Sequence, residues 1–157
     1  MPPAAASTDQ LWFVNTLVTF RVRHDEGDDG FSVMESFGAQ GVSPPLHLHQ
    51  AEDELFHVLE GELRVRAGDT EVTVGAGETI LGPKGVPHTY RVESPAGAHW
   101  LTITRGGDFE RFVHAVSRPA ERPELPPGEG PPAPDRANAL AAAAREHGIE
   151  FVGPPLA

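Results

Sequence analysis

The chain has 157 residues, 39% of them hydrophobic, and a formal net charge of −11. This acidity argues against binding nucleic acid or an anionic membrane surface, because both need a basic face. The absence of cysteine excludes disulfides and thiolate metal sites. The opening residues, MPPAAASTDQ, carry neither a positive segment nor an apolar run, so we expect no secretory signal and a cytoplasmic, single-domain protein.

The first and largest part of the chain has the pattern of an all-β domain. Residues 1–10 are expected to be a flexible N-terminus, and residues 11–117 alternate short apolar runs with turns. LWFVNTLVTFRVR and FSVMESF are separated by the turn sequence HDEGDDG, and the stretches HTYRVES and AHWLTITR are two later strands. Regular short strands of this kind predict a sandwich or barrel. LWFVNTLVTF is also a candidate for an edge strand exchanged between subunits, since apolar edges tend to be covered.

Composition changes after Ser117. Residues 118–134 are expected to be a proline-rich linker, because PAERPELPPGEGPPAPD holds seven prolines in seventeen residues. Residues 135–157 are expected to form a short C-terminal helix and a docking tail, IEFVGPPLA. Asp135 suits the helix N-cap and Gly148 its C′ position. This helix could be a lid, a dimer arm or a loose tail.

Four side chains in the β region have the chemistry of a metal site. His47 and His49 are two residues apart, so on an extended strand their side chains face the same side. Glu54 begins the strand ELFHVLE, and His88 begins another strand after a Pro/Gly turn. Three imidazoles and one carboxylate suit one divalent transition metal per chain (Fe, Mn, Co, Ni, Cu or Zn), whose identity the sequence leaves open.

Residues near these four have alternative interpretations. Glu52 and Asp53 could compete with Glu54, but they precede the strand, in a bend where acids are usually solvated. Strand parity places His57 on the face opposite Glu54, which favours a structural or interface role. Candidate pocket residues share the faces of Glu54 and His88, and core filling explains them equally well: Phe56, Val58, Tyr90 and Val92.

The spacing of these residues resembles the cupin superfamily. Two motifs, G-x5-H-x-H-x4-E-x6-G and G-x5-P-x-G-x2-H, match at nine positions: Gly41, His47, His49, Glu54, Gly61, Gly77, Pro83, Gly85 and His88. Val92 stands where the family usually has an asparagine, which is not a ligand. The resemblance covers roughly residues 30 to 115. It implies a jelly-roll barrel of six to eight strands that holds its metal near one mouth, usually in a homodimer.

A further resemblance concerns activity. GGDFERFVHAV and HTYRV look like segments of bacterial one-domain relatives of flavonol (quercetin) 2,3-dioxygenases. This implies an oxygenase in which Glu54 is both a metal ligand and the catalytic base. The leading hypothesis is therefore a metal-dependent dioxygenase that uses O2 on a small aromatic or enol-type substrate. The alternatives are an oxygen-independent isomerase, cyclase or lyase, and a non-catalytic small-molecule-binding protein.

Overall fold

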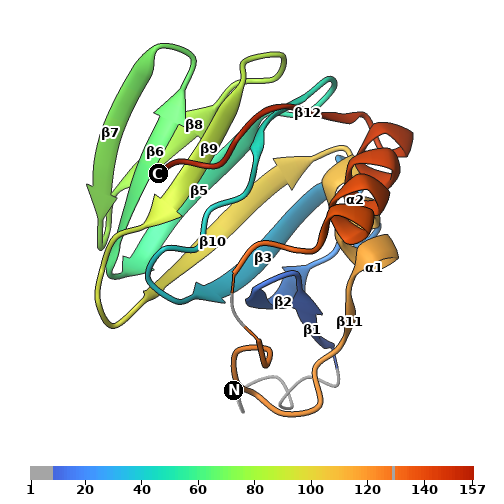
Figure 1. Cartoon of the computed structure of the whole chain (residues 1–157). Helices are drawn as coiled ribbons and strands as arrows, with labels where there is room; N and C mark the ends of the chain where they lie inside the picture. The colour runs from blue at the N-terminus through green and yellow to red at the C-terminus, as the bar shows by residue number, and fades with distance from the viewer. Residues whose placement is uncertain (1–8, 129) are drawn as a thin grey trace, which may run out of the picture.

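Two antiparallel sheets face each other and enclose most of the core (Figure 1). The computed structural model describes residues 9–128 and 130–157. One sheet has the order β11-β1-β2-β3-β10-β5-β8 and the other β12-β4-β9-β6-β7. The strands are β1 (Gln10–Phe13), β2 (Thr16–Val22), β3 (Phe31–Gly38), β4 (Leu46–His49), β5 (Glu54–Glu60), β6 (Glu62–Ala67), β7 (Thr70–Gly75), β8 (Thr79–Gly82), β9 (His88–Val92), β10 (Ala98–Arg105), β11 (Arg118–Pro119) and β12 (Ile149–Gly153).

Alternation along the strands explains how the sheets pack. In β10, Ala98, Trp100, Thr102 and Thr104 are buried, while the intervening side chains point outward. The inward side chains of five strands form one apolar cluster: Phe56, Val58, Leu63, Val65, Val74, Val92, Ala98 and Trp100. The predicted all-β jelly roll is confirmed. The described residues form twelve strands rather than six to eight, because segments at both ends of the chain join the sheets.

The N-terminal apolar stretch forms a hairpin and not a single strand. β1 and β2 pair with Phe13 opposite Thr16, so Val14 and Asn15 form the turn. Val14 has a φ of 54°, a conformation that a β-branched residue rarely adopts. β2 pairs with β3, and β1 is bordered by β11. Within the single chain these strands pair with each other, with β3 and with β11, and their exchange between subunits stays a prediction.

A helix that was not among the predicted elements follows β10. α1 (Asp108–Val116) buries Phe109, Phe112 and Val113, whose spacing places them on one helix face. These side chains pack against Val18 and other residues of a second apolar cluster. Gly107 precedes the helix with a φ of 86°, and a Cβ there would meet the Arg111 and His24 side chains. A glycine is therefore required at this turn.

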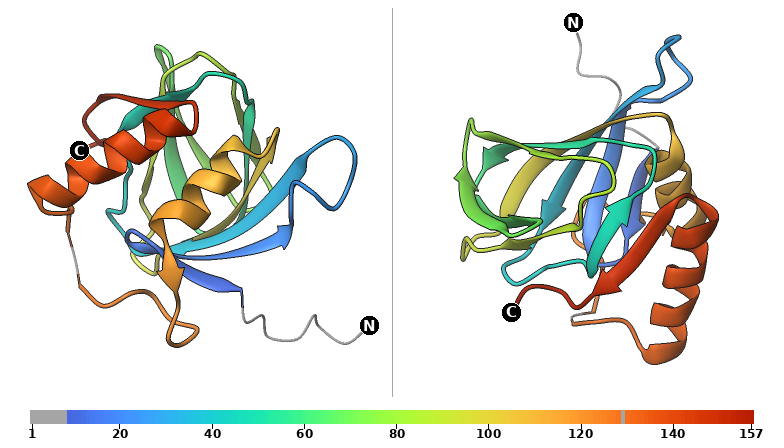
Figure 2. Two further views of the ribbon diagram at one scale, coloured as in Figure 1. Left: turned by 90° about the vertical axis from the view of Figure 1, so that its right-hand side faces the viewer. Right: turned by 90° about the horizontal axis from the view of Figure 1, so that it is seen from above.

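The C-terminal segment folds back onto the barrel. α2 (Pro134–Glu146) begins one residue earlier than predicted, and its N-cap is Ala133 without a side-chain bond, so Asp135 is not the cap. Gly148 has a φ of 72°, as its predicted position after the helix requires. β12 then pairs with β4. Both helices lie at the end of the barrel away from β7 (Figures 1 and 2).

The predicted division of the chain into four parts stays a prediction. Residues 1–8 of the expected flexible N-terminus lie outside the described residues, while Gln10 already belongs to β1. Arg118 and Pro119 of the expected linker pair with β1 as β11. Within the described residues, no helix is long and apolar enough to cross a membrane.

Candidate metal centre

Three strands bring the four predicted ligand residues to one place. His47 and His49 are the two inward-facing residues of β4, whose alternate positions are less buried. Glu54 starts β5 in the opposite sheet, and His88 starts β9, directly opposite His47 in the β4–β9 pairing. Strand parity and the strand pairing thus place these four side chains together between the two sheets.

The four side chains are close enough to share one ion. Each residue offers one ligand atom, and these atoms all lie within 4.8 Å of one another. Oε2 of Glu54 lies 2.7 Å from Nε2 of His88 and 2.9 Å from Nε2 of His49. The exposed fraction is 8% for His47 and 2% or less for the other three. The predicted set is brought together in full, while its role as a ligand set stays a prediction.

Backbone carbonyls orient two of the imidazoles. Nδ1 of His47 donates to the carbonyl of Pro45 over 2.7 Å, and Nδ1 of His88 lies 3.3 Å from that of Val86. For His47 this bond places the ring proton on Nδ1 and leaves the Nε2 lone pair facing the cluster, whereas Nε2 of His88 hydrogen-bonds Oε2 of Glu54 at 2.7 Å. Gly82 makes room for the His88 ring, since a Cβ there would lie 3.1 Å from Nδ1.

The protonation states of His47 and Glu54 suit a divalent cation. Burial lowers the pKa of His47 to about 3, and the neighbouring His88 and His49 act in the same direction, so this imidazole is neutral. Burial alone would raise the pKa of Glu54, but the two histidines that contact it hold the pKa well below its usual value. An ionised carboxylate and neutral imidazoles are the forms that bind first-row metals. The residues present therefore fit the implied ion.

His49 differs from the other histidines. Burial acts to lower its pKa, but the charge of Glu54, followed by those of Glu52 and Asp108, raises it above the ordinary value. Among the described residues, Nδ1 of His49 is buried without a hydrogen-bond partner. In the metal-free protein His49 therefore keeps its proton to a higher pH than a free imidazole does, and an ion binding here would displace that proton.

Of the two acids before Glu54, Asp53 agrees with the prediction and Glu52 does not. Asp53 is exposed and accepts a hydrogen bond from the Lys84 N–H at 2.8 Å. Glu52 was expected to be solvated, but it is only 2% exposed, so this expectation is wrong. Its Oε1 accepts the N–H of Phe109 at 2.7 Å, at the first turn of α1. Burial raises the pKa of Glu52. Its partner lies 57 residues away in sequence, so no local signal indicated this role.

The predicted pocket residues belong to the apolar cluster beside the site. Phe56, Val58 and Val92 are 2% exposed or less. The Tyr90 ring packs 5.7 Å from Phe56 and 5.1 Å from Trp100, between centroids, and burial raises the pKa of its hydroxyl. Whether these side chains also contact a substrate stays a prediction.

His57 lies on the outer face of β5, as strand parity predicted. Its Nδ1 is 2.8 Å from Oγ1 of Thr79 on β8. His57 and Glu54 are three residues apart on β5, so their side chains lie on opposite sides of the sheet.

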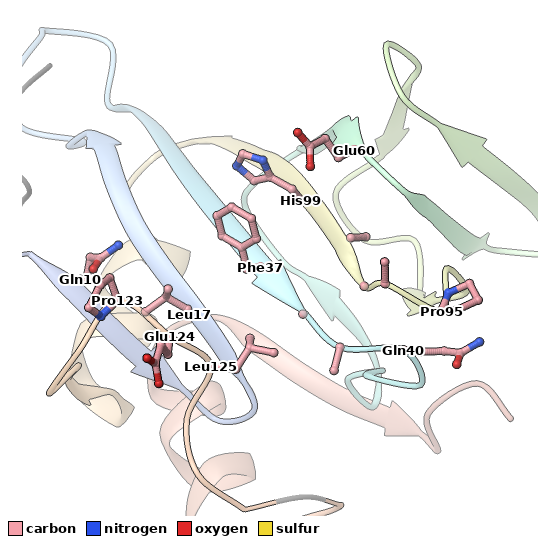
Figure 3. Close-up of a pocket in the computed structure, with 15 residues that line it drawn as sticks. Gln10, Leu17, Phe37, Gln40, Glu60, Pro95, His99, Pro123, Glu124 and Leu125 are labelled. Atoms are coloured by element: carbon pink, nitrogen blue, oxygen red, sulfur yellow. The ribbon is translucent and has the colours of Figure 1, made fainter.

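Two hollows that the sequence had not indicated lie away from the four-residue cluster. One, of about 380 Å³, runs along the ends of β3 and β10 and is bordered by residues 123–125 (Figure 3). Phe37 and His99 stack on its wall with ring centroids 3.9 Å apart. The second, of about 530 Å³, lies among turns near Gly61, Gly75 and Ser94. Neither hollow is lined by the four predicted ligands.

Comparisons with known proteins concern the part of the chain that contains the four residues. The family profile described as "Cupin domain" matches residues 33–104, which include all four predicted ligands. Quercetin 2,3-dioxygenase of Bacillus subtilis is 27% identical over 99 residues, which are 63% of this chain. The match spans only 29% of that relative's length.

Solved structures show the same fold. KdgF from a Halomonas species superposes with a TM-score of 0.52 at 13% identity, over 58% of this chain and 78% of its own. A sugar phosphate isomerase of the cupin superfamily from Silicibacter pomeroyi superposes with a TM-score of 0.53 at 20% identity, over 60% of this chain and 61% of its own. At such low identities the similarity concerns the fold alone.

Proposed function

We propose that this chain, whose residues 33–104 match the cupin family profile, is a cupin and a metal-dependent dioxygenase acting on a small aromatic or enol-type, flavonol-like substrate. The observation that carries the proposal is the buried set of three imidazoles around one carboxylate, with Oε2 of Glu54 within 2.9 Å of two histidines. The similarity to a bacterial quercetin 2,3-dioxygenase supports the choice of O2 and of a flavonol-like substrate.

In this proposal His47, His49 and His88 supply nitrogen ligands and Glu54 an oxygen ligand to one divalent transition metal per chain. When bound, the ion supplies Lewis acidity and open positions at which small molecules are held together. The preference for three nitrogens and one oxygen is shared by Fe, Mn, Co, Ni, Cu and Zn, so metal supply and geometry decide among them.

Glu54 is proposed as the catalytic base. The low pKa of its carboxyl keeps it ionised at neutral pH, so it can accept the proton of a substrate hydroxyl that lies beside it. A cation held by the four residues would stabilise the resulting negative charge, because charge interactions are strong in a buried site. His49 and His88 contact the same carboxylate oxygen and fix its direction.

The surroundings of the site favour a flat, apolar substrate. Phe56 lies 5.9 Å from His88 and Phe109 lies 5.4 Å from His49, between ring centroids, so aromatic surface borders two of the imidazoles. His47 is the most exposed of the four residues. We also propose that the protein is a cytoplasmic homodimer, as the family resemblance implies.

Oxygen uptake tests the proposal. Protein loaded in turn with each of the six metals is offered flavonols and smaller enols in an oxygen electrode. We expect uptake with at least one metal, and its loss in Glu54→Gln, which keeps the size of the side chain. His57→Gln, on the opposite face of the same strand, serves as the matched control and retains the activity. The absence of uptake with every metal would discard the dioxygenase.

The same samples separate the alternatives. Turnover of an enolisable substrate without oxygen would select a Lewis-acid isomerase, cyclase or lyase. Saturable binding without turnover would select a non-catalytic binding protein.

A further inference from the structure

The aromatic surface around the metal centre reaches solvent on one side. Phe56 and Phe109, which border two of the imidazoles, are both buried. The third imidazole, that of His47, faces Phe151 of β12, with ring centroids 6.3 Å apart and ring planes at 66°. Phe151 is half-buried, and His47 has the largest exposed fraction of the four predicted ligands. The more open side of the site therefore lies beside His47 and Phe151.

Strand pairing directs the Phe151 side chain towards the site. Phe151 lies directly opposite His47 in the antiparallel pairing of β12 with β4. Residues that are directly opposite in such a pair project from the same face of the sheet, so Phe151 shares the inner face with His47. Its neighbours Glu150 and Val152 are exposed on the outer face.

Hydrogen bonds hold β12 in place at both ends. The N–H of Gln50 donates to the carbonyl of Gly148 at 2.9 Å, and the N–H of Leu46 donates to the carbonyl of Pro154 at 3.2 Å. The strand follows α2 and runs beside β4 (Figure 1). Phe151 is therefore a fixed part of the surroundings of His47.

We propose that Phe151 is a specificity-determining residue, which forms the wall against which an aromatic ring of the substrate packs. A ring that is bound on the exposed side of His47 would lie against the Phe151 ring. Phenylalanine offers no hydrogen bond and packs well against flat aromatic surfaces. A sugar in the same place would leave hydroxyl groups unpaired against the phenyl ring, which is unfavourable. The substrate therefore places an aromatic ring, and not a polar group, beside β12.

This role rests on the proposed metal centre and names the part of the substrate that the proposed function leaves open, but it does not depend on O2. Phe151 lies outside residues 33–104, which match the cupin profile. The C-terminal segment, for which the sequence allowed a lid, a dimer arm or a loose tail, is then a wall of the site. Loss of oxygen uptake and loss of this wall are separate outcomes.

Two probes of different chemistry test the wall. The full-length, metal-loaded protein is titrated calorimetrically under nitrogen with 4-nitrocatechol, an aromatic diol, and with acetohydroxamate, a small chelator without a ring. Phe151→Ala removes the ring, and Phe151→Leu keeps a large apolar side chain without it. Val152→Ala, at the exposed neighbour on the outer face of β12, is the matched control. Thermal unfolding and metal content of each variant are recorded on the same samples.

We expect Phe151→Ala to raise the dissociation constant for 4-nitrocatechol about tenfold or more, and Phe151→Leu to raise it at least about twofold. Val152→Ala should leave it unchanged. The dissociation constant for acetohydroxamate and the metal content should stay the same in all three variants, because the ligands are unaltered. If Phe151→Ala does not fold, the result for Phe151→Leu decides.

Three results would overturn the proposal. The first is unaltered 4-nitrocatechol binding in the Phe151 variants. The second is an equal loss for both probes, which would mean that Phe151 only supports His47. The third is a metal-loaded, unaltered protein that does not bind 4-nitrocatechol. A protein that binds 4-nitrocatechol through Phe151 but takes up no oxygen with any flavonol would keep this wall and discard the dioxygenase.

Discussion

Replacing Ile149 with alanine tests whether the C-terminal segment holds the metal centre together. β4 carries His47 and His49 but pairs with β9 at one position only, His47 opposite His88. On its other side β12 pairs with β4 at four positions, and Ile149 lies directly opposite His49. The position of two proposed ligands therefore depends on β12.

The size of the effect follows from burial. Ile149 is 2% exposed and belongs to the apolar cluster that includes Val18, Phe109 and Ala144. Truncation to alanine should lower the free energy of unfolding by about 3 kcal/mol, within the range for buried isoleucines. It also loosens the strand that orients His49. We therefore expect the dissociation constant for the metal to rise about tenfold or more, as when other supports of metal ligands are removed.

Two measurements on the same protein separate stability from positioning. Urea unfolding of the metal-free protein gives the free energy of unfolding, and calorimetric titration of the folded protein gives the dissociation constant for the metal. Glu150→Ala, at the exposed neighbour on the same strand, is the control and should change the free energy of unfolding by less than about 0.5 kcal/mol. An Ile149→Ala protein that is less stable but binds metal as tightly as the original would refute the reasoning.

Three further predictions follow from individual side chains. Glu52→Ala should lower the free energy of unfolding by about 1–2 kcal/mol, because the Phe109 N–H at the start of α1 loses its acceptor. Glu52→Gln should recover most of this loss in urea unfolding, and equal effects of the two variants would contradict this role. Because the pKa of His49 is raised, metal binding near neutral pH should release a proton and should weaken as the pH falls from 8 to 6. Calorimetry in two buffers of different ionisation enthalpy measures the proton release, and a binding heat that does not depend on the buffer would contradict this prediction. Val14→Gly should raise the free energy of unfolding by about 1 kcal/mol, because the positive φ at this turn strains valine. Val14 is 37% exposed, so its removal loses little buried area. A less stable variant would show that the strain is negligible.

The clustering of His47, His49, Glu54 and His88 depends largely on local rules, which is why the sequence predicts it. His47 and His49 share a face because they are two residues apart on a strand, and parity separates His57 from Glu54 in the same way. Short turns then limit where β5 and β9 can begin. The jelly roll follows from the same alternation over many short strands.

The missed features depend on contacts between distant parts of the chain. The burial of Glu52 requires α1, which lies more than 50 residues later, and the pairing of β12 with β4 joins segments about 100 residues apart. Neither has a local signal, because both are set by tertiary packing. α1 itself was open to prediction. Phe109, Phe112, Val113 and Val116 have the spacing of a helix face, although the strands before them suggested an all-β context.

The hairpin of β1 and β2 shows a different limit. Val14-Asn15 is not a favoured two-residue turn, because valine resists positive φ, and the apolar run through it reads as one strand. The pairing of β2 with β3 and the burial of Val18 and Phe20 outweigh that local preference. Tertiary packing thus selects a turn that local propensity disfavours.

Metal content of the purified protein tests the central claim most directly. Elemental analysis of the full chain, after loading and removal of excess ion, should give about one divalent transition metal per chain. His49→Ala should lose most of it and remain folded by circular dichroism, while His57→Ala, on the outer face of β5, should keep it. An unaltered chain that binds none of the six metals, or a His49→Ala protein that retains the full amount, would contradict the account.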